Sequence, residues 1–187
     1  MTERPRILRA PTGLFWLVGV AAVAVLLLGD VVVRGGGEQA LLIAPWLLVP
    51  VWFVYVFFYA PHVAVDARRV RVHNVLRAVE LPWAAVDDIV MRWQLEFHLT
   101  EAARAANPAA GGRKGVVLAW SFTRRGRGRA AARVAEETDD TLDVLRGLRA
   151  SAEPQPDARP TVSWDIPAIV TGVVIAAWCV VALVVTR

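Results

Sequence analysis

The side chains best suited to acid–base catalysis or metal binding are three histidines, His62, His73 and His98. An imidazole exchanges its proton near neutral pH and is a common metal ligand. The three residues are scattered along the chain at positions that the local pattern predicts to be polar. We therefore interpret them as surface histidines and predict neither a metal site nor a cofactor.

Two pairs of aspartates are the other candidates for acid–base chemistry, Asp87 with Asp88 and Asp139 with Asp140. Catalytic carboxylates must converge on one reacting group, and neighbours in sequence are poorly placed to do so. A turn explains the first pair and a helix cap explains the second. We predict no catalytic residue, and we therefore expect a protein that is not an enzyme.

Glycine-rich stretches and the single cysteine offer no chemistry either. "GGRKG" (111–115) and "RRGRGR" (124–129) lack the spacing and the strand-to-helix context of a phosphate-binding loop, so we interpret both as solvated turns. Cys179 is the only cysteine and lies in an apolar run, which excludes a disulfide and disfavours a thiolate.

The distribution of charge is more informative. Eight basic residues and no acidic one occur from Arg104 to Arg133, whereas the next ten residues hold five acids and no base. The basic side chains could contact lipid or a protein partner, or could simply be solvated. The candidate contact residues are Arg113, Lys114, Arg124, Arg125, Arg127 and Arg129. Binding of nucleic acid is not predicted, since the aromatic residues nearby are expected to face inward.

The elements that carry these residues begin with membrane segments. Hydrophobic residues make up 56% of the 187 residues, and the mean hydropathy of +0.45 is high for a soluble domain. Three apolar windows are each long enough to cross a hydrocarbon core as a helix. They cover 13–33, 40–60 and 166–186. Residues 13–60 would form a hairpin with "RGGGEQ" (34–39) as its turn, and Pro45 and Pro50 would kink its second helix.

Arginines near the ends of these windows predict the orientation. Arginines concentrate in the tail 1–12 and in the section between the second and third windows, whereas the opposite side holds only Arg34 and Arg187. Cytoplasmic segments carry such an excess of basic residues. We therefore expect a multi-pass protein of the cell membrane, with the N-terminus and the middle section in the cytoplasm and the C-terminus outside.

The section 61–90 alternates polar and apolar residues as a sheet does. A turn is predicted at "DARR" (66–69), and in "HNVL" (73–76) Asn74 tolerates the left-handed conformation of a second turn. Pro82 ends a third strand because it cannot donate to a ladder, and Trp83 would fill the end of a small core. "AAVDD" (84–88) then turns the chain.

The clearest predicted strand covers 91–99, with one apolar and one polar face. Its expected inward residues are Met91, Trp93, Leu95, Phe97 and Leu99. A strand at 115–123 would turn alternate residues inward, namely Val116, Leu118, Trp120 and Phe122. The stretch 124–129 then predicts a hairpin turn and 130–135 a returning strand.

A helix capped by Asp139, Asp140 and Thr141 should follow, with leucines on one face. Residues 151–165 would be a linker that is rich in proline. The expected cytoplasmic domain, 61–150, is therefore a bent antiparallel sheet of about six or seven strands closed by one C-terminal helix. That arrangement is the α+β architecture of the pleckstrin-homology (PH) domain.

An extended strand pair, an Asn-containing turn, an Arg, and Pro-Trp before a short acidic turn follow one another in the section 61–90. The positions of this motif are Asp66, Val70, Val72, Asn74, Leu76, Arg77, Leu81, Pro82, Trp83 and Ile89. In this order the sequence resembles a family, the bacterial membrane-anchored PH-domain proteins. The family often has Gly after the Asn, where this chain has Val75. The resemblance implies a fold and a membrane address, and it implies no established activity or phosphoinositide binding.

Two hypotheses for function remain open. The first is a non-enzymatic integral membrane protein whose PH-like domain binds a protein partner or the anionic lipid surface, in a scaffold or regulatory role. The alternative is a subunit of an oligomeric transporter or channel in which that domain acts as a cytoplasmic gate. The nearly charge-free apolar windows count against the alternative, because polar residues mark transport paths.

Overall fold

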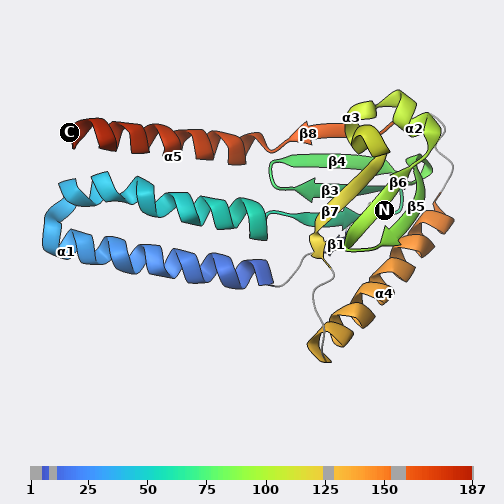
Figure 1. Cartoon of the computed structure of the whole chain (residues 1–187), viewed down its shortest axis with the longest axis horizontal. Coiled ribbons are helices and arrows are strands. Elements are labelled where there is room, and N and C mark those ends of the chain that lie inside the picture. Colours follow the sequence, from blue (N-terminus) through green and yellow to red (C-terminus); the bar gives the residue numbers. More distant parts are fainter. Residues whose placement is uncertain (1–5, 9–11, 124–128, 153–158, 187) are drawn as a thin grey trace. The chain divides into compact units, whose positions relative to one another are not determined.

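The structure is a computed structural model that describes residues 6–8, 12–123, 129–152 and 159–186, without the side chains of 122–139. The chain divides into two compact units, which we describe separately. The β unit contains the sheets, built from residues before Pro11 and from Pro61–Trp164. The helical unit contains Pro11–Ala60 and Asp165–Arg187 (Figure 1).

The helical unit consists of α1 (Thr12–Val54), which continues as the π-helical turn η1 (Tyr55–Tyr59), and of α5 (Ile166–Val185). Gly36 inside α1 has φ 78° and ψ 177°, which is not helical, and the chain folds back there into two arms (Figure 1). A glycine fits this turn because it has no Cβ to clash at positive φ. The predicted hairpin and its turn are therefore present, and α1 continues through Pro45 and Pro50.

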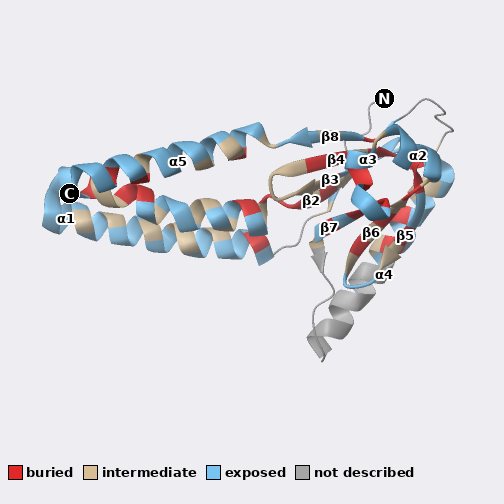
Figure 2. Ribbon diagram, turned by 45° about the horizontal axis from the view of Figure 1, so that its top comes forward, coloured by how far each residue is buried: buried red, intermediate tan, exposed pale blue. Residues whose placement is uncertain are grey.

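The prediction of three separate membrane helices is corrected to two helical segments. In the described part of the chain, Thr12–Tyr59 and Ile166–Val185 are long and apolar enough to cross a membrane. In the most apolar stretch of Thr12–Tyr59 no residue is buried. In the corresponding stretch of Ile166–Val185, 17% of the residues are buried. The apolar surface of both helices is thus largely uncovered by the rest of the chain (Figure 2).

Small residues line the contact between the second arm of α1 and α5. The indole of Trp52 donates a hydrogen bond of 2.9 Å to the carbonyl oxygen of Ala168. Gly172 lies under the same ring, and a Cβ built there would lie 2.6 Å from it. Close approach at small residues is how apolar helices pack without water to drive them together.

The larger sheet of the β unit has five antiparallel strands in the order β1-β2-β3-β4-β8. Their bounds are β1 Arg6–Leu8, β2 His62–Val65, β3 Arg69–Asn74, β4 Arg77–Pro82 and β8 Thr161–Trp164. The alternation predicted for β2 and β3 is confirmed, whereas in β4 Ala78 and Pro82 are buried together with the predicted Val79 and Leu81. The two edge strands were not predicted: β1 lies in the expected tail and β8 in the expected linker, and each pairs with a strand far away in sequence.

The smaller sheet has the order β5-β6-β7 and differs from the prediction in two ways. Residues 91–99 do not form the expected single strand. They contain the end of β5 (Val86–Met91), a turn and β6 (Gln94–Leu99), which together make a hairpin. Trp93 lies at the turn and is 80% exposed. In β7 (Val116–Thr123) the inward residues are Val117 and Ala119, so the predicted facing of this strand is wrong. Their small side chains lie opposite Phe97 and Leu95 of β6, which fill the core.

Helix α4 (Arg129–Ser151) begins ten residues before the predicted cap, and 130–135 is helix rather than strand. The predicted leucine face is confirmed, since Leu142 and Leu145 are buried in the core. Arg146 donates to the carbonyl oxygen of Ile89 on edge strand β5 at 3.1 Å. This contact blunts an edge that could otherwise pair with another chain.

Short helical turns complete the β unit. They are η2 (Trp83–Ala85), α2 (Glu101–Ala106), α3 (Pro108–Gly111) and η3 (Gly112–Lys114). As predicted, Trp83 closes the end of the core: it is 2% exposed, and its indole donates to the Asp66 carbonyl at 2.9 Å. The core lies between the two sheets and α4, and the buried residues are on the inner faces (Figure 2).

Candidate binding groove

The outer face of the smaller sheet carries side chains that the core does not use. Leu95 and Phe97 of β6 point inward, so Glu96 and His98 point outward by the alternation of a strand. The register places Glu96 beside Leu118 of β7 and His98 beside Val116. Polar residues of the central strand thus lie next to apolar residues of β7.

A groove of about 440 Å³ lies on this face. Its lining combines basic side chains with an apolar surface, and it consists of Arg92, Glu96, His98, Gly111, Arg113, Lys114, Val116 and Leu118. Three cationic side chains therefore accompany one carboxylate. No Ser, Thr or Cys is among the residues that line the described groove.

The turn η3 brings Arg113 and Lys114 to the groove. Gly115 has φ 63°, a left-handed conformation that ends the turn, and Gly111 packs so closely that a Cβ would lie 2.8 Å from Leu99. Asn107 caps α3 by accepting from the amide of Ala109. The glycines of "GGRKG" thus shape a turn, as the sequence predicted, and the turn places two cations at the rim.

The acidic side of the groove is a Glu–His pair. Nε2 of His98 lies 3.4 Å from Oε2 of Glu96, and their side chains are 33% and 18% exposed. A carboxylate in this position balances part of the positive charge of the rim. The remaining excess is cationic, which favours an anionic ligand.

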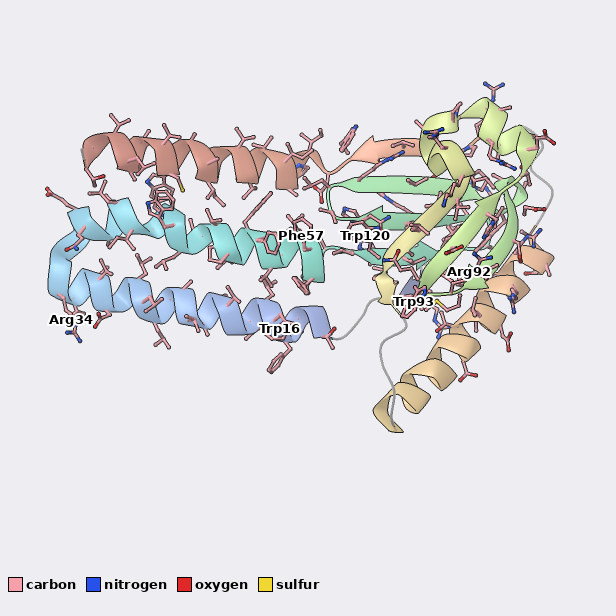
Figure 3. The ribbon with its side chains drawn as sticks, viewed as in Figure 1. Trp16, Arg34, Phe57, Arg92, Trp93 and Trp120 are labelled. Atoms are coloured by element: carbon pink, nitrogen blue, oxygen red, sulfur yellow. The ribbon has the colours of Figure 1, made fainter. Side chains whose placement is uncertain are left out.

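The apolar side of the groove continues along β7. Leu118 is 39% exposed and Trp120 is 51% exposed. Asn74, at the end of β3, holds this strand from the other sheet: its Nδ2 donates to the Leu118 carbonyl at 2.6 Å, and its Oδ1 accepts from the Trp120 amide at 3.0 Å. Figure 3 shows Trp120 on β7 and Arg92 at the β5–β6 turn.

The turn after Asn74 departs from the prediction. The residue with a left-handed conformation is Val75, with φ 33°, and Asn74 instead supplies the clamp on β7. A β-branched residue is strained at positive φ. A glycine at this position would remove that strain.

Of the predicted contact residues, the structure brings Arg113 and Lys114 together at the groove. Arg124, Arg125 and Arg127 lie outside the described residues, and the side chain of Arg129, the first residue of α4, does as well. Sequence reasoning missed Arg92, Glu96 and His98 as groove residues. The polar face of the 91–99 alternation was the available signal for all three.

Two further polar clusters lie on the larger sheet. Arg69 contacts Asp66 and Glu80, and the hydrogen bond and attraction from Glu80 raise the pKa of Arg69 above its ordinary value. This cluster fixes the β2–β3 turn, as Asp66 also accepts from two backbone amides. His62 and His73, scattered in sequence, are directly paired across β2 and β3, with ring centroids 5.0 Å apart.

Comparisons of the chain with family models, with curated proteins and with solved structures give no match. Among the described residues, no three His, Cys, Asp or Glu side chains gather as a potential metal site. The site must therefore be interpreted from its own geometry, which is that of an open groove with a cationic rim and an apolar wall.

Proposed function

We propose that this protein is a membrane-anchored binding protein whose β unit holds an acidic segment of a partner protein in the groove without catalysing a reaction. Binding rather than catalysis is proposed because the groove offers cations and apolar surface but no hydroxyl or thiol nucleophile among its lining residues. The observation that carries the proposal is the gathering of Arg92, Arg113 and Lys114 around the apolar residues of β7.

The anchor part of the proposal rests on the helical unit. At the helical rise the first arm of α1 (12–35) is about 36 Å long, the second arm (37–54) is about 27 Å and α5 is about 30 Å, which suits a hydrocarbon core of about 30 Å. Trp16 and Phe57 lie at one end of this unit and Arg34 lies at the other (Figure 3). Aromatic side chains and charges are enriched at the two faces of a membrane.

The proposal includes three crossings of the membrane, made by the two arms of α1 and by α5, with the β unit in the cytoplasm. Reporters fused after Glu38 and after Arg187 should then lie outside, and one inserted near Asn107 should lie in the cytoplasm. An exchange of these compartments would contradict the orientation, which rests on the arginine asymmetry. We also propose that the β unit is a PH-like domain, because two antiparallel sheets enclose its core with α4.

The groove suits an extended acidic segment. Carboxylates would pair with the guanidinium of Arg92 or Arg113 and with the ammonium of Lys114, in charge-assisted hydrogen bonds. An apolar side chain between them would cover Val116 and Leu118, which the β unit leaves partly uncovered. Salt should weaken the complex, since the screening length is about 8 Å at physiological ionic strength.

Binding of a labelled model peptide of alternating Glu and Leu residues to the full chain in detergent tests this function. Charge reversal in the double variant Arg113→Glu/Lys114→Glu should lower its affinity about tenfold, because about 1.4 kcal/mol of lost attraction is a factor of ten. The matched control is Arg68→Glu, an exposed arginine in the β2–β3 turn.

The control variant should bind the acidic peptide as the native chain does, and a peptide of alternating Lys and Leu should bind poorly to the native chain. Equal binding of the two peptides, or equal loss of affinity in the double variant and the control, would show that the groove does not recognise acidic segments.

A further inference from the structure

All three connections between the β unit and the helical segments leave the larger sheet at one end. β2 begins at His62, β8 ends at Trp164, and β1 ends at Leu8, which pairs with Val63 next to His62. The register joins Asn74 to Arg77 and Arg77 to Trp164 across β3, β4 and β8. The strand ends that carry the connections therefore lie side by side.

These connections are short. Three residues separate β1 from α1, two separate η1 from β2, and Asp165 alone separates β8 from α5. An extended residue spans at most about 3.6 Å, so the longest connection reaches roughly 14 Å across its four peptide steps. If the helices cross a bilayer, this end of the sheet cannot move far from its surface.

The same end displays two exposed tryptophans. Trp164 is 61% exposed and Trp120 is 51% exposed. Trp120 is fixed there because its amide donates to Asn74, and Trp164 lies two strands from Asn74, about 10 Å at the usual strand spacing. The backbone carbonyl of Leu118 accepts from the same Asn74, and the exposed side chain of Leu118 lies on the same face of β7 as Trp120.

We propose that this end of the β unit is a lipid-contacting surface, in which the rings of Trp120 and Trp164 lie in the headgroup layer of the bilayer. An indole suits this layer because it combines a large apolar ring with one polar N–H group, and tryptophan is enriched there. The proposal rests on the anchor part of the proposed function. It involves the connection-bearing end of the unit, and it does not require the groove to bind any ligand.

The two rings would restrict the orientation of a unit that is otherwise tethered only by short backbone connections. Lipid would cover apolar surface that the described chain leaves exposed, which is favourable in proportion to the area removed from water. The opposite end of the sheet, at the β2–β3 turn with Ala67, should remain in water. The two ends of the sheet therefore differ in a way that lipid quenchers can measure.

The experiment uses the full chain with Cys179→Ala, labelled at one introduced cysteine with an environment-sensitive fluorophore. The chain is placed in nanodiscs of phosphatidylcholine and phosphatidylglycerol that contain lipids with a quencher near the headgroup or at mid-chain. The reporter positions are Trp120→Cys, Ser163→Cys, Ala67→Cys and Val174→Cys. Ser163 is exposed next to Trp164 on β8, so Ser163→Cys keeps both indoles in case removal of Trp120 disturbs β7.

The shallow quencher should act on position 120 or 163 at least about twofold more strongly than on position 67. The label on Val174, an exposed residue of α5, should be quenched best from mid-chain. If Val174 is quenched but positions 120 and 163 match position 67, the lipid contact is wrong while the anchor stands. If Val174 escapes the mid-chain quencher, the anchor itself fails and the lipid contact fails with it.

Discussion

Replacing Phe97 by Ala should destabilise the β unit far more than replacing Trp93 by Ala, although the sequence alone places both residues on one inward face. Phe97 is 0% exposed and packs between the sheets, whereas Trp93 is 80% exposed at the β5–β6 turn. Removing a buried phenylalanine ring costs about 3 to 5 kcal/mol, because the contacts are lost and a cavity remains. Removing the exposed indole should cost less than about 1 kcal/mol.

Amide hydrogen exchange of the full chain in detergent, read out on β6 and β7, measures this difference directly. The exchange rate of a protected amide follows the free energy of opening, so about 3 to 5 kcal/mol corresponds to roughly a hundredfold to several-thousandfold faster exchange. Trp93→Ala should change it less than about fivefold. Leu118→Ala serves as a second exposed control on β7.

Similar acceleration by Phe97→Ala and Trp93→Ala would refute the division of 91–99 into a hairpin with Trp93 at its turn. A large effect of Leu118→Ala together with tolerance of Ala119→Leu would refute the facing of β7. Ala119 is 0% exposed, so a leucine there should overpack the core at a cost of about 1 to 3 kcal/mol.

Three further changes test other parts of the structure. Val75→Gly should stabilise the β unit by about 1 kcal/mol in denaturant titration, as glycine relieves the strain at φ 33°; destabilisation would contradict the turn conformation. Asn74→Ala should destabilise it by about 1 to 2 kcal/mol, since two hydrogen bonds to β7 are lost, and an unchanged midpoint would show that water replaces the clamp. Gly172→Leu should speed proteolysis of the helical unit because its side chain would collide with Trp52, whereas Gly19→Leu, at a site with no neighbour within 4 Å, should have little effect.

The sequence determined the local features of both units. Val63 and Val65 alternate with His62 and Ala64, and Val70 and Val72 alternate with polar residues, so this period alone places β2 and β3 with one face in the core. Pro82 ends β4, as predicted, because proline has no backbone N–H to donate to the next strand. The apolar windows likewise predicted the long helices, and the glycines between them predicted the turn.

The tertiary structure decided which face of β7 is inward. The run from Val116 to Trp120 is apolar at both parities, so a period of two cannot choose between its faces. Phe97 and Leu95 already fill the core from the opposite strand, and only the smaller Val117 and Ala119 fit against them.

Long-range strand pairing likewise determined where the two edge strands form and which residues line the groove. β1 and β8 are three and four residues long and exist because β2 and β4 offer them backbone partners from elsewhere in the chain. Arg92 and Lys114 are distant in sequence and meet only because β5, β6 and β7 form one sheet. A sequence records residue types and local periods, whereas such pairings depend on which surfaces remain to be covered once the core is filled.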